Sequence, residues 1–350
     1  SSAASDVYKR QNHNMEYSRA EAILHAAKEA GVDAVKLQTY TADTITLNSD
    51  KKYFRTRDNS LWSGTTEYKL YEKAYTPWEW QPKLKELADK IGIILFSSPF
   101  DLSSVDFLEE MDVPAYKIAS PEIVDIPLIK KCAQTGKTII ISTGVASIGD
   151  IERAVDVCRQ EGNENVILLK CTAEYPAPYS QMNLKTIKNM EETFGCPAGL
   201  SDHSLGDEIA IAAVAMGAKV IEKHFTLHRA DGGVDSAFSM EAEEMKRMVE
   251  RIRHVEQAMG TVKYDFDSNS EEKKRRGRSL FVSADIKKGD TFTEHNIKSV
   301  RPGYGLHTQY YFDVLGKRAA RDLSFAEPLQ IGDIESVSYT HLTLPTKLEV

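Results

Sequence analysis

The sequence predicts an α/β protein, a (β/α)8 TIM barrel that lacks its first strand, followed by a small C-terminal domain. Three observations predict this architecture. Short apolar runs alternate with amphipathic helical patterns between residues 18 and 260, as they do in a parallel sheet. Nearly every apolar run ends in polar side chains. The composition changes after residue 262, where a charge-dense segment begins.

The predicted strands are short apolar runs, and seven are found. They span residues 33–39, 92–98, 115–120, 138–143, 165–172, 197–202 and 218–225. Helical patterns separate them, at 18–31, 82–92, 104–111, 126–136, 150–162, 184–194 and 207–217, and several end in glycine. A last helical pattern at 241–260 closes the barrel. An open doubly wound sheet is the alternative, but no early strand leads into a GxGxxG turn.

The two ends of the chain do not join naturally to what they flank. Residues 6–11, DVYKRQ, resemble the translated end of a common transposase sequencing adapter. Residues 337–346, VSYTHLTLPT, resemble its reverse complement read onward. We therefore set residues 1–11 and 336–350 aside as adapter-like artefacts, the alternative being two natural tails. The first barrel strand falls within residues 1–11, so we expect it to be missing.

The domain organisation follows from these patterns. We predict a barrel domain over residues 12–262, a solvated linker over 263–278 and a small domain over 279–335. The small domain shows short strands and turns. A core this thin is expected to dock on another surface.

Composition indicates a soluble enzyme. The 350 residues are 41% hydrophobic, which is enough for a sizeable core, and the net charge of -8 argues against a general nucleic-acid binder. The four cysteines have no CxxC spacing and are expected to be reduced thiols. No long apolar run or signal peptide is found, so we expect a cytoplasmic protein that does not contact a membrane.

The active site of a βα barrel lies at the C-terminal ends of its strands. Polar residues that close the apolar runs are the candidates: Lys36, Gln38, Ser97, Ser98, Lys117, Ser120, Glu122, Ser142, Thr143, Lys170, Thr172, Tyr175, Ser201, His203, Lys223 and His224. Lysines and hydroxyls dominate this set. They predict a site for a phosphate or a carboxylate.

Two histidines end adjacent strands. Neutral imidazoles at His203 and His224 could share one divalent cation, and a general-base role for one of them is the competing interpretation. Glu122 is either a salt-bridge partner of Lys117 or a carboxylate that moves protons on a substrate. A Schiff-base aldolase with Lys117 or Lys223 as nucleophile is a further alternative, against which the paired histidines weigh.

Ordered motifs across residues 12–335 carry a resemblance to a known family. They are NHN, DAVKLQTYTADTITL, FSSPFD, PAYKIASPE, ISTGVAS, KCTAEYPAP, GLSDHS, VIEKHFTL and SVRPGYGLH. In these motifs the chain resembles the nonulosonic acid (sialic acid) synthase family. The stretches LWSGTTEYKLYEKAYTPWEW, KIAS and DSAFSM are most similar to its pseudaminic acid branch.

The resemblance implies a reaction and an assembly. The reaction is the metal-dependent condensation of phosphoenolpyruvate with 2,4-diacetamido-2,4,6-trideoxy-altrose, which gives pseudaminic acid and phosphate. The small domain would be an antifreeze-like (SAF) domain that caps the barrel of the partner in a homodimer.

The resemblance also implies roles for individual residues. His203 and His224 would hold Mn²⁺, with Mg²⁺ or Co²⁺ as alternatives. Phosphoenolpyruvate would contact Lys36, Ser98, Lys117, Ser120, Ser142 and Ser201. The acetamido-deoxyhexose would face Gln38, Glu122, Tyr175 and Asp235, and Arg301 of the partner subunit would reach its acetamido groups.

Two departures from the family pattern bear on function. A glutamate that the family carries before its first NH motif corresponds to Tyr8 here, and Ala173 stands where sialic acid synthases proper carry asparagine. Ala173 favours a deoxy sugar over N-acetylmannosamine. The alternatives are a legionaminic or N-acetylneuraminic acid synthase, or an inactive truncated barrel that only binds ligand or dimerises.

Overall fold

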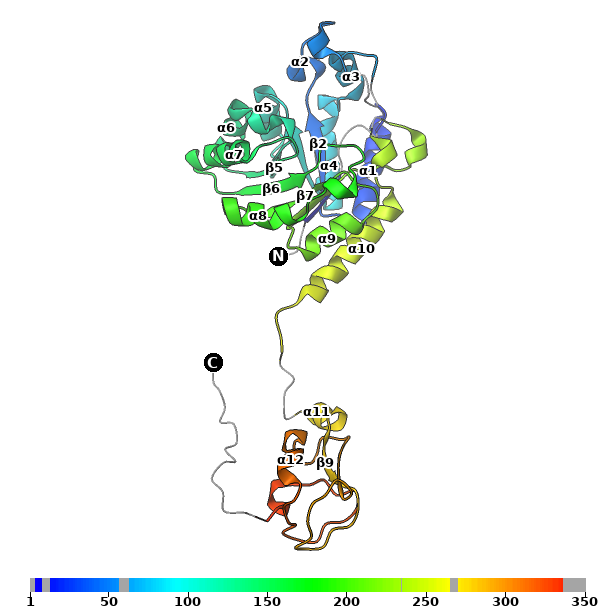
Figure 1. Cartoon of the computed structure of the whole chain (residues 1–350). Helices are drawn as coiled ribbons and strands as arrows, with labels where there is room; N and C mark the ends of the chain where they lie inside the picture. Colours follow the sequence, from blue (N-terminus) through cyan, green and yellow to red (C-terminus); the bar gives the residue numbers. More distant parts are fainter. Residues whose placement is uncertain (1–3, 8–12, 57–62, 234, 265–269, 336–350) are drawn as a thin grey trace. The chain divides into compact units, whose positions relative to one another are not determined.

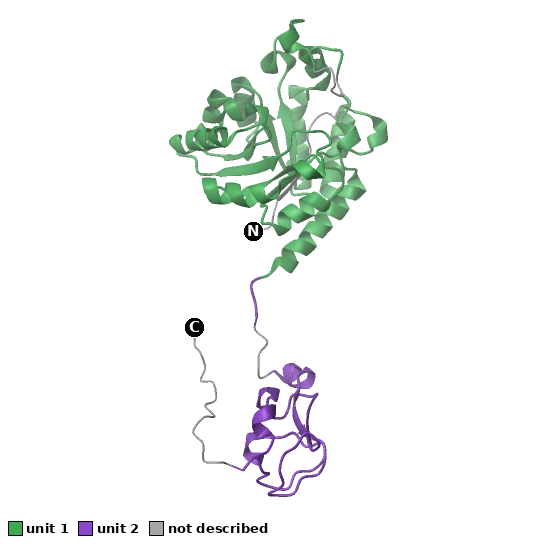
Figure 2. Ribbon diagram, viewed as in Figure 1, with its two compact units in different colours: residues 1–260 green, residues 261–350 purple. Residues whose placement is uncertain are grey.

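The computed structural model describes residues 4–7, 13–56, 63–233, 235–264 and 270–335. They belong to two compact units, residues 1–260 and 261–350, which Figure 2 distinguishes by colour. The division falls two residues before the predicted end of the barrel domain. We describe each unit by itself.

The first unit is a closed barrel of eight parallel strands in sequential order (Figure 1). The strands are β1 (Ala4–Val7), β2 (Ala34–Thr39), β3 (Ile94–Pro99), β4 (Ala115–Ile118), β5 (Thr138–Ser142), β6 (Val166–Cys171), β7 (Ala198–Asp202) and β8 (Val220–Lys223). The seven predicted strands are all present, and the predicted TIM barrel is confirmed.

The expectation of a missing first strand is wrong for this structure. β1 pairs in parallel with β2, where Asp6 lies opposite Ala34, and with β8, where Ser5 lies opposite Ile221. Without β1, the facing edges of β2 and β8 would leave backbone groups unpaired. Backbone pairing requires an extended segment and no particular side chains, so a stretch set aside for its adapter-like sequence can still close the barrel.

Helices surround the barrel (Figure 1). They are α1 (Tyr17–Glu29), α4 (Gln81–Ile91), α5 (Leu102–Glu110), α6 (Ile126–Gln134), α7 (Ile148–Gln160), α8 (Lys185–Phe194), α9 (Glu208–Ala215) and α10 (Ala242–Met259). Their apolar faces join the outward side chains of the strands in one continuous core. The eight helical patterns of the sequence are thus all present.

Two short helices after β2 were not predicted. α2 (Ala42–Ile45) and α3 (Glu67–Ala74) begin at the N-caps Thr41 and Thr66, whose hydroxyls accept hydrogen bonds from Thr44 and Lys69 backbone N–H groups. Each buries a single residue, Ala42 in α2 and Ala74 in α3, so neither shows the apolar stripe by which a helix is recognised in the sequence.

Short 3₁₀ helices occupy several loops of the first unit. They are η1 (Lys52–Phe54), η2 (Trp78–Trp80), η3 (Pro121–Val124), η4 (Tyr179–Gln181), η5 (Arg229–Asp231) and η6 (Ser236–Phe238). Of these, η3, η4, η5 and η6 follow the C-terminal ends of β4, β6 and β8. They therefore help to build the mouth of the barrel.

A glycine allows two strands next to the site to approach closely. A Cβ atom on Gly199 in β7 would lie 2.2 Å from the carbonyl oxygen of Val220 in β8. No side chain can be accommodated there, so this glycine is required for the tight pairing of the two strands that carry the histidines.

The second unit has its own small core. β9 (Ser279–Val282) pairs antiparallel with β10 (Ile297–Val300), and buried Leu280, Phe292 and Leu323 pack between them and the surrounding turns. The unit also contains α11 (Glu271–Arg276), η7 (Thr308–Tyr310), α12 (Tyr311–Val314) and η8 (Ile331–Asp333). α11 lies where a solvated linker was predicted. Within the described part of the chain, no helix is both long and apolar enough to span a membrane.

Candidate active site

The alternation of side chains along β7 and β8 builds the centre of the site. Ser201 and His203 share one face, and Glu222 and His224 share the matching face of the neighbouring strand. The Ser201 hydroxyl donates to Glu222 Oε1 at 2.7 Å, and the rings of His203 and His224 lie 5.1 Å apart between centroids. The two strand ends that the sequence singled out therefore meet.

A buried polar cluster lies next to the histidines, and we call Lys36, Lys117, Ser142, Ser201 and Glu222 the inner cluster. Lys36 Nζ lies 2.6 Å from Glu222 Oε2. Lys117 Nζ donates to Ser142 Oγ at 2.6 Å and lies 3.8 Å from the same Glu222 oxygen. All five side chains are almost fully buried. The two lysine side chains bring cationic groups to the floor of the barrel mouth, which suits an anionic ligand.

His203 has the geometry of a metal ligand. Its Nδ1 atom lies 2.9 Å from the backbone carbonyl oxygen of Thr172, which requires Nδ1 to carry the proton and leaves Nε2 as the acceptor. Nε2 is buried and has no hydrogen-bond partner among the described residues. An imidazole whose second nitrogen bonds a carbonyl while the first is left for a cation is the usual arrangement at metal sites.

His224 lies close to a carboxylate. Its Nδ1 atom lies 3.4 Å from Oδ2 of Asp235, which is buried and follows β8. The described residues contain no group of three or more His, Cys, Asp or Glu that could hold a metal. Two histidines could hold a divalent ion only together with water or substrate, and such open positions are typical of catalytic metal sites.

Aromatic rings flank the histidines. The Tyr175 ring centroid lies 4.4 Å from that of His203, and Phe238 in η6 lies 5.2 Å from Tyr175 and 4.9 Å from His224. Phe238 is a site residue that the sequence reasoning quoted only within the DSAFSM stretch. These rings would limit the access of water to the imidazoles.

Two serines at neighbouring strand ends are prepared for hydrogen bonding. Ser98 Oγ, in β3, is buried and has no hydrogen-bond partner among the described residues. Ser120 Oγ accepts the backbone N–H of Gly144 at 3.0 Å. A Cβ on Gly144 would lie 2.9 Å from both Ser120 Oγ and Cys171 Sγ, so any larger residue there would displace these side chains.

The other candidate residues lie in different places. Gln38 is buried on β2, on the same face as Lys36, and half-buried Glu122 lies on η3 directly after β4. Arg301 belongs to the second unit, where it lines a hollow of about 460 Å³ with Phe281 and Phe325. The structure does not place that unit relative to the barrel. Tyr8 lies outside the described residues.

Lys223 is a candidate that the structure removes from the site. Its ammonium points to the opposite face of β8, where it donates to Asp202 Oδ2 at 2.7 Å and to the Ser204 carbonyl at 2.8 Å. Ser97 faces outward in the same way, bonded to Thr39 Oγ1 at 2.7 Å. Lys223 is thus unsuited to be a Schiff-base nucleophile at the barrel mouth.

Three further strand-end candidates are engaged with nearby backbone. Thr143 Oγ1 donates to the Leu169 carbonyl at 3.1 Å, and Thr172 Oγ1 donates to the Gln181 carbonyl at 3.2 Å. Lys170 Nζ donates to the Cys171 carbonyl at 2.8 Å and to Thr172 Oγ1 at 3.0 Å. Burial lowers the pKa of Lys170. These contacts are those expected of residues that fix strand ends.

Glu222 is the residue that the sequence reasoning missed. The signal was present, because a two-residue period counted back from His224 leads to Glu222, as it leads from His203 to Ser201. The list of strand-end candidates contains its neighbour Lys223 instead, whose side chain lies on the opposite face of β8.

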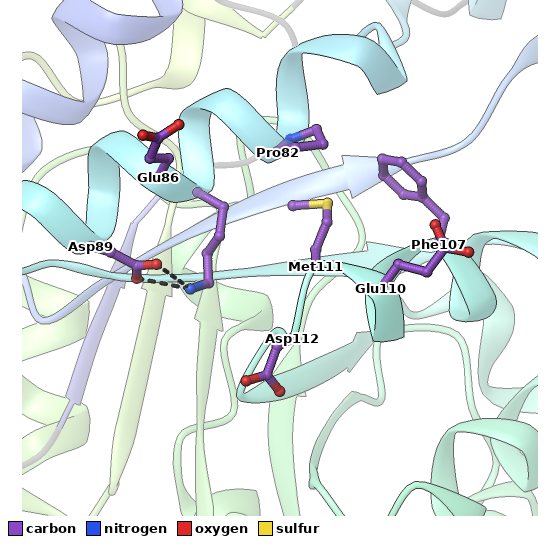
Figure 3. Close-up of a pocket in the computed structure, with 8 residues that line it drawn as sticks. Pro82, Glu86, Asp89, Phe107, Glu110, Met111 and Asp112 are labelled. Atoms are coloured by element: carbon purple, nitrogen blue, oxygen red, sulfur yellow. Dashed lines mark hydrogen bonds and ion pairs between the residues drawn. The ribbon is translucent and has the colours of Figure 1, made fainter.

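A hollow on the outer wall of the barrel has a different character. It measures about 520 Å³ and is lined by residues of α4 and α5 and the turn after them, including Glu86, Glu110 and Asp112. Figure 3 shows the labelled carboxylates Glu86, Asp89, Glu110 and Asp112 that line it. Lys85, the one lysine of its lining, donates to both carboxylate oxygens of Asp89, at 2.8 and 2.6 Å. This predominantly acidic surface does not suit an anionic substrate, which leaves the barrel mouth as the better site.

Comparison with known proteins identifies the family. Residues 23–264 match the NeuB family and residues 277–335 match the SAF domain. The chain is 44% identical to a pseudaminic acid synthase of Campylobacter jejuni over 93% of this chain and 94% of that protein. It is 36% identical to an N,N'-diacetyllegionaminic acid synthase of the same species, over 89% and 94%.

A solved structure agrees with the fold. The N-acetylneuraminic acid (sialic acid) synthetase of Leptospira borgpetersenii, solved in complex with citrate, is similar with a TM-score of 0.69 and 29% identity, over 78% of this chain and 90% of that chain. The chain therefore belongs to the NeuB family and carries a SAF domain at its C-terminus.

Proposed function

We propose that this protein condenses phosphoenolpyruvate with 2,4-diacetamido-2,4,6-trideoxy-altrose to give pseudaminic acid and inorganic phosphate. The observation that carries the proposal is the inner cluster beside the two histidines, a cationic site next to a candidate metal site. The choice of sugar rests on the greater similarity to a pseudaminic acid synthase, 44% against 36% for a legionaminic acid synthase.

Phosphoenolpyruvate would bind with its negative charges over the ammonium groups of Lys36 and Lys117. The hydroxyls of Ser98, Ser120, Ser142 and Ser201 supply short donors around them, and Ser98 Oγ is the one whose hydrogen bonding within the described residues is incomplete. Because the lysines are buried, their charges act in a medium of low polarity, where they stabilise an anion more than they would in water.

His203 and His224 would hold a divalent ion, for which we propose Mn²⁺, with Mg²⁺ or Co²⁺ as alternatives. A bound ion would act as a Lewis acid on the aldehyde oxygen of the open-chain sugar. The Thr172 carbonyl holds the His203 ring for this purpose, and the Asp235 carboxylate lies 3.4 Å from Nδ1 of His224. Tyr175 and Phe238 limit the access of water to them.

The atoms of the reaction balance with water as the only reactant besides phosphoenolpyruvate and the sugar. C3 of phosphoenolpyruvate attacks the aldehyde carbon, a C–C bond forms, and the aldehyde oxygen takes up a proton. Water then adds at C2, and Glu122 would accept its proton. The C2–O bond to the phosphate breaks, phosphate leaves with the electron pair, and the new hydroxyl becomes the carbonyl of the 2-keto acid. Lys36 and Lys117 stabilise the phosphate charge throughout.

We further propose that the protein is a cytoplasmic homodimer in which the SAF domain of one copy covers the barrel mouth of the other. Exposed apolar side chains in the loops after β4 to β7 support a covering surface: Val124, Val145, Ile148, Tyr179 and Leu205. Arg301 of the partner subunit would then reach the acetamido groups. All four cysteines are buried and free, which suits a reducing compartment.

The test is phosphate release from phosphoenolpyruvate in the presence of Mn²⁺, with product mass determined in parallel. The altrose sugar, its legionaminic-type isomer and N-acetylmannosamine are supplied in turn. We expect release with the altrose sugar alone and its loss on chelation. Release with another sugar would overturn the substrate, and binding of phosphoenolpyruvate without release from any sugar would favour the inactive barrel. A Tyr8→Glu variant, assayed alongside, measures the effect of the departure at residue 8.

A further inference from the structure

Glu222 lies at the centre of the inner cluster, and the reaction described above gives it no role. We propose that Glu222 is a positioning residue that holds Lys36, Lys117 and Ser201 in the arrangement that receives phosphoenolpyruvate. The identity of the anion as phosphoenolpyruvate rests on the proposed function. The contacts of Glu222 that support the proposal do not depend on which sugar is the second substrate.

The contacts of Glu222 reach three other strands. From β8, Oε2 lies 2.6 Å from Lys36 Nζ on β2 and 3.8 Å from Lys117 Nζ on β4. The other oxygen, Oε1, accepts the Ser201 hydroxyl on β7 at 2.7 Å. One side chain thus fixes the ends of three substrate-binding side chains that converge from different parts of the barrel.

The charge balance explains why a carboxylate is required at this place. Two fully buried ammonium groups without a counter-charge would each suffer a large desolvation cost and would repel each other. Glu222 supplies such a counter-charge, because its carboxylate lies 2.6 Å from Lys36 Nζ and 3.8 Å from Lys117 Nζ.

The neighbouring pair Asp202–Lys223 provides a matched control. It has the same chemistry and almost the same burial, with Lys223 Nζ 2.7 Å from Asp202 Oδ2, but it lies on the opposite face of the same two strands. Asp202 also accepts the backbone N–H of Ser204 at 2.8 Å, so this pair fixes the turn after β7. A buried ion pair with only a structural role should behave like this one.

The experiment compares Glu222→Gln, Glu222→Asp and Asp202→Asn in the full chain. Calorimetry gives the Kd for phosphoenolpyruvate without sugar, and kinetics give KM for each substrate and kcat. We expect both Glu222 variants to raise the Kd and KM for phosphoenolpyruvate roughly tenfold or more, with the sugar KM within about twofold of the parent. Glutamine keeps the length and removes the charge, whereas aspartate keeps the charge and cannot span the same contacts.

Asp202→Asn should lower the Tm and leave the affinity for phosphoenolpyruvate unchanged. The proposal is overturned if the Glu222 variants bind phosphoenolpyruvate as well as the parent does, which would make Glu222 a second structural ion pair. Tighter binding by Glu222→Gln would also overturn it, because the carboxylate would then act only by repelling the anion. If the parent binds phosphoenolpyruvate but condenses no sugar, the proposed function fails while the affinities still decide the role of Glu222.

Discussion

Two histidines of the barrel unit are equally buried but differ in how many of their ring nitrogens have hydrogen-bond partners. His13, before α1, and His203, after β7, are 1% and 2% exposed. In His13 both nitrogens are occupied, because Nδ1 accepts the Met15 N–H at 3.1 Å and Nε2 lies 3.2 Å from Thr76 Oγ1. In His203 only Nδ1 has a hydrogen-bond partner among the described residues.

The comparison shows that burial by itself does not identify a functional histidine. His13 is neutral because burial, assisted by the charge of Arg19, lowers its pKa to about 4. It uses its whole hydrogen-bonding capacity to fix the start of α1 against the loop before α4. A ligand histidine differs in that one nitrogen is fixed by the protein and the other is left for a cation.

The largest effect that separates the two histidines is on activity. His203→Ala should lower kcat roughly a thousandfold, about 4 kcal/mol, because a metal ligand is lost, while the Tm changes little. Phosphate release and calorimetric titration with Mn²⁺ measure the two consequences. The exposed His228 provides a control, since His228→Ala should match the parent in both. A His203→Ala variant that still bound Mn²⁺ as the parent does would remove the proposed distinction from His13.

Sequence patterns predicted most of the fold because the barrel repeats the same local physics. The apolar runs of β2 to β8 and the amphipathic helices between them are long enough to show their periods. α2 and α3 escaped because they depend on the caps Thr41 and Thr66 and not on a stripe of apolar residues. β1 escaped because its pairing depends on backbone groups of β2 and β8.

The site was predictable at the level of strand ends and less so for the direction of side chains. His203 and His224 were found because each ends an apolar run. Glu222 and Lys223 are adjacent in sequence and equally polar, and only the register of β8 decides which of them faces the interior. The contacts of Phe238 and Asp235 depend on the loop after β8, whose path no local pattern specifies.

A smaller effect that distinguishes His13 is on the pH dependence of the unfolding free energy. Because the pKa of His13 is about 4 when folded and 6.5 in the ordinary case, the unfolded chain takes up the proton first as pH falls. The stability associated with neutral His13 is therefore present above pH 6.5 and is lost progressively toward pH 4, by at most about 3 kcal/mol. His13→Gln should remove this part of the pH dependence.

Urea unfolding at pH 7 and pH 5 measures the contribution of neutral His13 to stability. Between these values the parent should lose about 2 kcal/mol more of its unfolding free energy than His13→Gln does. Phosphate release per folded molecule at pH 7 should be the same for both proteins. Equal losses for the two proteins would mean that His13 is not held neutral by its surroundings.

The substitution with the smallest expected effect tests whether the hydrogen bond to the Thr172 carbonyl is sufficient to orient the His203 ring. The backbone of Gly144 is not in the left-handed region, so the cost of alanine there comes from its Cβ, which would lie 2.9 Å from Ser120 Oγ and Cys171 Sγ and would force these side chains to shift. Cys171 Sγ lies 3.9 Å from His203 Nδ1. Gly144→Ala should displace Ser120 and raise the KM for phosphoenolpyruvate roughly fivefold, about 1 kcal/mol. Its affinity for Mn²⁺ should stay unchanged, because the Thr172 carbonyl fixes the imidazole.

If the affinity of Gly144→Ala for Mn²⁺ falls together with that for phosphoenolpyruvate, the orientation of His203 depends on the packing of Cys171. The hydrogen bond to Thr172 is then insufficient to explain that orientation.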